Sequence, residues 1–293
     1  MHILYLASTF FLIFIFFYIY QQGITNKDDH VQKKKKVINN RKIILTITSY
    51  LDFDKENKWD ALCTAIDSIL YYHPNVNFLV DIYVINEYVP NPKEDWSEKI
   101  KQKYPFVNFI QKTKELKGQG ESLNLILDII KTYTYWIHWE EAWYCIRPFI
   151  FDAVQIMDST KITQLQFTKE LDGTEFGHTH WKEKIDINNC HRMPRDNNYC
   201  ILKYNIEDYP KIDIDKEFTY DNWMTIKWPL YSIRPSINRV KDYNFGKFLI
   251  NPEYWPLKFE IDFGQRWMKR NYIKAIFAEG CVTRRQTHIS TYK

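Results

Sequence analysis

Short runs of buried-type residues alternate with amphipathic stretches between residues 42 and 168, and this alternation constrains the fold more than any other feature. Five runs have the composition of buried strands: residues 42–49, 78–85, 107–110, 133–138 and 163–168. Four stretches carry apolar residues at helical spacing: residues 59–72, 96–104, 122–132 and 149–158. Alternation of this kind builds right-handed βαβ units. We therefore predict an α/β domain with a mixed, mostly parallel sheet flanked by helices.

The C-terminal third is less regular. Residues 173–210 are polar, rich in His and without periodicity, so we interpret them, including His178 and His180, as a loop. A loop of that length inside a compact domain commonly has a function. Regular structure is predicted to return over residues 245–250 and in a helix over residues 259–271.

A continuous apolar run precedes the α/β pattern. Residues 3–20 carry no charge and, as a helix, would span roughly 27 Å, close to the thickness of a bilayer core. A cleavable signal peptide is the alternative, but the run lacks the basic start and small residues that such peptides have. We predict a transmembrane signal-anchor at residues 1–22, a flexible basic stem at 23–41 and one domain at 42–293.

The orientation of this single-pass anchor is left open by two signals. Four lysines at residues 33–36 favour a cytosolic domain by the positive-inside rule, and the chain has no Asn-x-Ser/Thr sequon. The alternative is the luminal Golgi or ER arrangement of a type II membrane protein. The lysine block favours the cytosolic side.

Charge and cysteine content exclude several classes of protein. The net charge is +4 on 40 basic and 36 acidic residues, and no basic face is interleaved with the fold, so no nucleic-acid partner is expected. The five cysteines form no Cys-x-x-Cys pair, which argues against zinc knuckles and thioredoxin-like sites. Cys190 and Cys200 are a candidate disulfide, but unpaired thiols are the preferred interpretation without sign of an oxidising compartment.

Polar residues follow three of the predicted strands. Open α/β sheets bind ligands beyond the carboxyl ends of their strands. We expect a nucleoside to be held at that edge, although polar residues are also common in ordinary turns. The candidates are Ser49, Tyr50, Asn86 and Glu87, with Glu140 and Glu141 after the fourth strand.

The segment from Gly118 to Asn124 opens a helix. Gly118 and Gly120 allow a tight bend before the helix N-terminus, where backbone N–H groups favour an anion. The chain then returns through a strand to Glu140 and Glu141, whose carboxylates suit a hard divalent cation that neutralises a diphosphate. An exposed acidic turn is the alternative.

These motifs resemble the catalytic half of GT-A (Rossmann-like) glycosyltransferases, in particular the family-2-like group. There a Gly-x-x-x-Ser-x-Asn helix start, matched by residues 118–124, precedes a strand that ends in an acidic motif. The resemblance implies donor contacts at Gly118, Gly120 and Asn124, with Glu141 as the main metal ligand and Glu140 as a ligand or ribose contact. It implies Mn²⁺ or Mg²⁺ as cofactor. The family motif is usually rich in Asp, and here it contains Glu.

Residues 255–267 resemble the late helix of the same enzymes, in which an acidic residue is the general base. Glu260 takes that place and Asp262 is the reserve candidate; a helix N-terminus also favours acids for its dipole. His288 resembles the His that completes the metal shell. Arg284 and Arg285 are candidates for pairing with diphosphate oxygens.

The predicted function is therefore inverting, metal-assisted transfer of a sugar from a UDP- or GDP-linked donor to a hydroxyl of a glycan, protein or lipid, at a lipid bilayer. Two alternatives remain. One is an inactive membrane-tethered carbohydrate-binding or scaffold protein. The other is a nucleotidyltransferase, which would normally carry a Gly-rich basic loop after the first strand; residues 49–54 lack one.

Overall fold

The computed structural model describes residues 42–51, 57–92, 94–168, 190–193, 197–202, 231–250 and 258–285. The predicted anchor, the stem and His288 lie outside these ranges, as do His178 and His180. Within the described ranges, none of the helices is long and apolar enough to cross a membrane.

The first half of the domain is a parallel βαβ arrangement. The order β3-β2-β1-β4 places β1, all seven residues of which are buried, in the interior of the sheet. Each adjacent pair of these four strands is parallel. The strands are β1 (Ile43–Ser49), β2 (Val80–Asn86), β3 (Val107–Gln111) and β4 (Tyr135–Glu140), and the helices between them are α2 (Lys58–Tyr72), α3 (Trp96–Lys103) and α4 (Gln119–Ile129).

The second half extends the same sheet with reversals of direction. β9 (Ser236–Arg239) lies antiparallel between β4 and β6 (Ile162–Gln166), and β10 (Ile273–Phe277) is parallel to β6. An antiparallel hairpin of β7 (Cys190–His191) and β8 (Tyr199–Ile201) completes the order β3-β2-β1-β4-β9-β6-β10-β8-β7. Among the described strands of this sheet only β9 and β8 run against the others, which confirms the predicted mixed, mostly parallel α/β sheet.

The remaining elements cover the sheet. A small second sheet pairs β5 (Trp143–Cys145) with β11 (Val282–Arg284), and two further helices are α5 (Ile150–Ser159) and α7 (Lys258–Met268). Short 3₁₀ turns are η1 (Val76–Phe78), η2 (Lys114–Leu116), η3 (Ile130–Thr132) and η8 (Val240–Tyr243).

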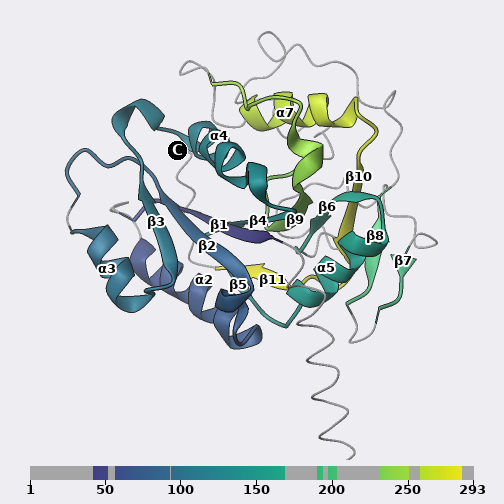
Figure 1. Cartoon of the computed structure of the whole chain (residues 1–293), viewed down its shortest axis with the longest axis horizontal. Coiled ribbons are helices and arrows are strands. Elements are labelled where there is room, and N and C mark those ends of the chain that lie inside the picture. Colours follow the sequence, from purple (N-terminus) through teal and green to yellow (C-terminus); the bar gives the residue numbers. More distant parts are fainter. Residues whose placement is uncertain are drawn as a thin grey trace, which may run out of the picture. The chain divides into compact units, whose positions relative to one another are not determined.

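Helices cover both faces of the sheet. α4 and α7 lie on one face, and α2, α3 and α5 lie on the other (Figure 1). On the α4/α7 face, Trp136 of β4 belongs to a core cluster with Leu123 and Phe263. On the opposite face, Trp139 of the same strand stacks on Phe149, with ring centroids 6.1 Å apart. Alternate residues of β4 thus enter two separate layers.

Several predicted boundaries were wrong. Residues 245–250 form neither helix nor strand, whereas β9 and β10, which the sequence analysis did not predict, are central to the sheet. The predicted fourth strand ended at residue 138, but β4 continues to Glu140. The interval 173–210, predicted to be a loop, contains the hairpin of β7 and β8.

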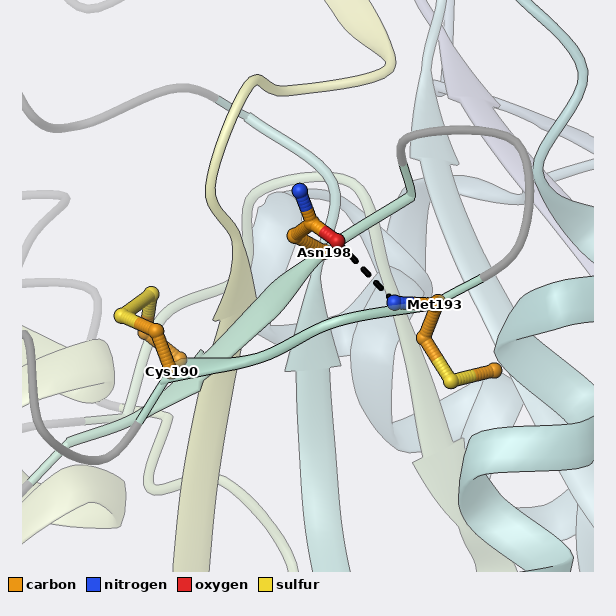
Figure 2. Close-up of a disulfide and its surroundings, with 4 residues drawn as sticks. Cys190, Met193 and Asn198 are labelled. Carbon is orange, nitrogen blue, oxygen red and sulfur yellow. Dashed lines mark hydrogen bonds between the residues drawn. A yellow bond between two sulfur atoms is a disulfide. The ribbon is translucent and has the colours of Figure 1, made fainter.

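The β7–β8 hairpin is cross-linked. Cys190 and Cys200 are directly opposite in the antiparallel pair and form a disulfide with an S–S distance of 2.07 Å (Figure 2). The backbone N–H of Met193 donates to Asn198 Oδ1 at 2.9 Å. The preferred interpretation of these two cysteines as unpaired thiols was therefore wrong, while Cys63, Cys145 and Cys281 are free and buried.

Candidate active site

The ends of β1 and β2 meet, as predicted, at the carboxyl edge of the sheet. Ser49 pairs in register with Asn86, and the Ser49 hydroxyl donates to Asn86 Oδ1 at 3.1 Å. The same oxygen accepts the Leu51 N–H at 3.0 Å, and the Asn86 amide donates to Gln111 at 2.8 Å. Ser49 and Asn86 are buried and Tyr50 is half-buried. The candidate nucleoside-binding residues thus share one edge, with the Asn86 amide held by its neighbours.

A buried lysine joins the end of β2 to the start of α4. Lys112 Nζ lies 3.0 Å from Glu87 Oε2 and donates to the Gly118 carbonyl at 2.8 Å and to Ser122 Oγ at 2.7 Å. Glu87 in turn accepts the Gly118 N–H at 3.1 Å. Burial lowers the pKa of Lys112, and the charge of Glu87 opposes that shift. Glu87 therefore fixes the helix start at this edge.

Gly118 is the bend that the sequence predicted. Its φ of 105° lies in the region that favours glycine, and it is the N-cap of α4. Gly120 is already helical, and a Cβ there would meet Ile250 and Phe259 at 3.7 Å. The amide of Asn124 donates to the Phe248 carbonyl at 3.0 Å and accepts the Phe248 N–H at 2.7 Å. Asn124 thus ties the chain before α7 to α4, and its polar groups are used by the protein backbone.

Glu140 is the last residue of β4 and faces the α4/α7 side. It accepts hydrogen bonds from Gln119 Nε2 and from Trp143 Nε1, both at 3.1 Å. Burial raises the pKa of Glu140, and the charge of Glu141 adds to the shift. The charges of Arg284 and Arg234 act in the opposite direction on the same pKa.

Glu141, in the turn after β4, points toward α2. Its Oε1 lies 3.0 Å from Nζ of Lys58, the first residue of α2, and the Lys58 side chain is 0% exposed. The backbone N–H of Glu141 still donates to Thr48, at 3.1 Å, which continues the β1–β4 ladder past Glu140. The two adjacent carboxylates therefore have different partners.

Three arginines approach the acidic motif from other elements. Arg284 pairs with Trp143 in the β5–β11 sheet, and the Arg285 N–H donates to the Ala142 carbonyl at 2.8 Å. Arg234 lies two residues before Ser236, which pairs with His138, so it comes level with Glu140. Arg284 and Arg285 are predicted for this site from the sequence. Arg234 is not, because no periodic pattern marks the segment that leads into β9.

Glu260 lies in the first turn of α7 and is buried. Its Oε1 accepts the Ile233 N–H at 3.0 Å. Burial raises the pKa of Glu260 to about 7; the Ile233 hydrogen bond and the charge of Arg234 oppose the shift, and the charge of Glu140 adds to it. Asp262, the reserve candidate, instead accepts two hydrogen bonds from Arg266, at 2.8 and 2.6 Å.

The described side chains do not fit a cation held by a carboxylate cluster. Over these ranges no three His, Cys, Asp or Glu residues come together as a metal site. Glu141 is paired with Lys58, whereas Glu140 accepts from Gln119. His138 is fully buried in β4, and burial lowers its pKa to about 3. His288, the remaining predicted ligand, lies outside the described residues.

Searches against protein families and against the sequences of curated proteins find no match. Solved structures do match. Residues 1–349 of S. aureus TarS align with a TM-score of 0.51 at 12% identity, covering 82% of this chain and 59% of that one. The same fragment in complex with UDP aligns with a TM-score of 0.48 at 12% identity, with the same coverage. A mycobacterial protein aligns with a TM-score of 0.48 at 13% identity, covering 88% of this chain and 72% of that one.

The likeness to TarS concerns the fold. This chain spans 59% of the length of the TarS fragment, and identity of 12% carries no residue-level correspondence. The mixed α/β architecture predicted from the sequence is thus one that a solved structure shares.

Proposed function

We propose that this chain is a glycosyltransferase that moves a sugar from a nucleoside diphosphate to a hydroxyl acceptor. The fold, the carboxyl-edge location of the candidate residues and the chemistry of that edge support this proposal. The donor would be UDP- or GDP-linked, and the acceptor a hydroxyl of a glycan, protein or lipid. Residues 3–20 are the proposed bilayer anchor.

The observation that carries the proposal is the environment of Glu260. A carboxylate that accepts a proton from a hydroxyl group works best when its pKa lies near the working pH. Burial in the first turn of α7 gives Glu260 a pKa of about 7. The Ile233 N–H fixes one of its oxygens at 3.0 Å. Asp262 has no comparable environment, since Arg266 occupies its carboxylate.

The proposed step is a single displacement. Glu260 takes the proton of the acceptor hydroxyl as the acceptor oxygen forms a bond to the anomeric carbon of the sugar. The bond from that carbon to the β-phosphate oxygen breaks, and its electron pair leaves with the nucleoside diphosphate. Attack from the side opposite the leaving group inverts the anomeric configuration.

The donor side of the edge is proposed to hold the nucleoside. Ser49 and Tyr50 end β1, and Asn86 and Glu87 end β2, beside the N-terminus of α4. The N–H groups of the first turn of a helix favour adjacent phosphates, and here Glu87 accepts the one from Gly118. Glu140 lies between this region and α7 and is a candidate for ribose contact.

The proposal predicts release of a nucleoside diphosphate from a donor sugar. The full-length protein in detergent is expected to release UDP or GDP from one of a panel of UDP- and GDP-sugars, faster when a hydroxyl acceptor is added. UDP-sugars come first, because TarS of similar fold has been crystallised with UDP. Binding of glycans without release would favour a carbohydrate-binding or scaffold protein. Release of pyrophosphate from a nucleoside triphosphate and a sugar phosphate would favour a nucleotidyltransferase.

The pKa of Glu260 predicts a pH profile. Because a general base must be ionised, turnover is expected to rise with pH through about 7 and then level off. Stability changes in the opposite direction: between 4.5 and about 7 the folded state holds a proton that the unfolded state has released, so stability falls as pH rises. Urea unfolding and turnover measured from pH 5 to 8.5 would check both trends. If the stability of Glu260→Gln changes with pH in the same way as that of the unmodified protein, Glu260 is not the group with the raised pKa.

A further inference from the structure

Resting on the proposed function, we infer that Arg234 and Arg284 bind the donor diphosphate and take the place of a divalent cation. Diphosphate is the leaving group of the proposed reaction, and its negative charge must be neutralised as the bond to the sugar breaks. Two guanidinium groups carry the same formal charge as one Mg²⁺ or Mn²⁺. They also donate N–H groups in a planar fork that matches phosphate oxygens.

The two carboxylates of the acidic motif, Glu140 and Glu141, are held by different parts of the protein. Glu141 points toward α2, where the ammonium of Lys58 lies 3.0 Å away and is shielded from solvent. Glu140 accepts from Gln119 of α4 at Oε1 and from Trp143 of β5 at Oε2. Mg²⁺ at a phosphate site is usually held by one or two carboxylates together with the phosphate oxygens. Here each carboxylate of the acidic motif is already held by donors of the protein, and the two do not share a partner.

Two arginines from separate parts of the chain lie beside the acidic motif, where a cation would be required. Arg284 is delivered by β11, which pairs with β5 directly after the acidic motif. Arg234 lies in the segment just before β9, and β9 pairs with β4. Both residues are half-buried.

The charges of Arg234 and Arg284 also lie near the carboxylates of the proposed site. Arg234 and Arg284 both act on the pKa of Glu140, and Arg234 also acts on that of Glu260. The positive charges therefore lie within electrostatic reach of the carboxylate at the donor edge and of the proposed base. A diphosphate bound there would leave from a cationic surface that the protein itself supplies.

The test measures binding of UDP and GDP to the full-length protein by calorimetry, in EDTA and in Mn²⁺ or Mg²⁺. The unmodified protein is expected to bind one of the two with affinities that differ less than about threefold between EDTA and metal, since no ion bridges the diphosphate. Arg284→Gln and Arg234→Gln are each expected to weaken that binding about 10- to 100-fold, the worth of a charge-assisted hydrogen-bond pair. Binding of the free nucleoside, which has no phosphate, is expected to be unchanged.

Arg266→Gln is the matched control, because Arg266 pairs with Asp262 on α7 and is expected to leave nucleotide affinity unchanged. Loss of affinity in EDTA that metal restores would overturn the inference and leave the proposed function standing; this comparison needs no variant. Equal loss of diphosphate and nucleoside binding in the Arg284 and Arg234 variants would overturn it as well. If neither nucleotide binds under any condition, the inference and the proposed function fail together.

Discussion

Glu260→Gln is expected to reduce the turnover of sugar transfer by about 10²- to 10⁴-fold, the usual contribution of a general base. Glutamine keeps the size of the side chain and an oxygen that can accept the Ile233 N–H. In the unmodified protein this N–H lies 3.0 Å from Glu260 Oε1. What it loses is the ability to take a proton. Nucleotide affinity is therefore expected to be retained, and the defect should lie in turnover. Single-turnover transfer and calorimetry on the same preparation would separate the two quantities.

Asp262→Asn is the matched control for this prediction. Asp262 lies on the same helix, two residues on, but its carboxylate accepts from Arg266 and does not face the proposed site. The turnover of Asp262→Asn is expected to stay close to that of the unmodified protein. A large loss in Asp262→Asn with little loss in Glu260→Gln would reverse the assignment. Equal loss of nucleotide binding in both would show that α7 holds the donor and supplies no base.

Lys58→Met is expected to destabilise the domain by about 3–5 kcal/mol, because it removes one partner of a buried ion pair. Lys58 is fully shielded and Glu141 is 9% exposed, and the two charged groups lie 3.0 Å apart between α2 and the end of β4. Methionine fills a similar volume, so the loss should reflect the charge on Glu141 and little change in packing. Urea unfolding at neutral pH, followed by circular dichroism, would measure it.

A double variant and an exposed pair give the controls. Lys58→Met combined with Glu141→Gln removes both charges and is expected to recover most of the lost stability. Lys131→Met breaks a solvent-exposed pair with Asp128 and is expected to cost less than about 1 kcal/mol. If Lys58→Met costs no more than Lys131→Met, the pair is not buried in solution. If the double variant is as unstable as the single one, the loss is one of packing.

The first half of the fold was predictable because its signals are local. β1 is buried along its whole length and contains almost only β-branched residues and Leu, and each following helix presents a periodic apolar face. Parallel strands joined by helices have one favoured handedness, which fixes their arrangement. The convergence of Ser49 and Asn86 followed from this topology, and the structure confirms it.

Two strands of the second half, β9 and β10, were not predictable because polar residues interrupt them. β9 has the sequence Ser-Ile-Asn-Arg, and its Asn238 accepts from Gln164 of β6 and from Tyr243. β10 has a fully buried lysine, Lys274, in its second position. Neither strand shows the continuous apolar pattern that predicts a buried strand. Their partners are visible only in three dimensions.

The acidic motif shows how a small boundary error changes the chemistry. With the fourth strand ending at residue 138, Glu140 and Glu141 belong to one turn and their carboxylates can share an ion. With β4 extended to Glu140, Glu141 lies in the turn after the strand, and the two carboxylates bond to different partners. Lys58, the ion-pair partner of Glu141, is the first residue of α2. Nothing in the sequence around Lys58 indicates this pairing.

The Cys190–Cys200 disulfide bears on the orientation of the anchor. Disulfides persist in oxidising compartments and are rare in the cytosol. The cross-linked hairpin is of the kind expected in an oxidising compartment, whereas the lysines at residues 33–36 favour the cytosolic side, so the orientation of the predicted anchor stays a prediction.

The insertion of β9 between β4 and β6 has a consequence for the order in which the domain assembles. Ser49 and Asn86, bonded at the ends of β1 and β2, are 37 positions apart, whereas Asn238 of β9 bonds to Trp136 across 102 positions. Contacts that close longer loops cost more chain entropy and form more slowly. The β1–β2–β3 part is therefore expected to gain protection from hydrogen exchange first during refolding. Glu140 of β4, Arg234 and Glu260 would join it later, so the edge formed by Ser49 and Asn86 would exist before the groups proposed to act there.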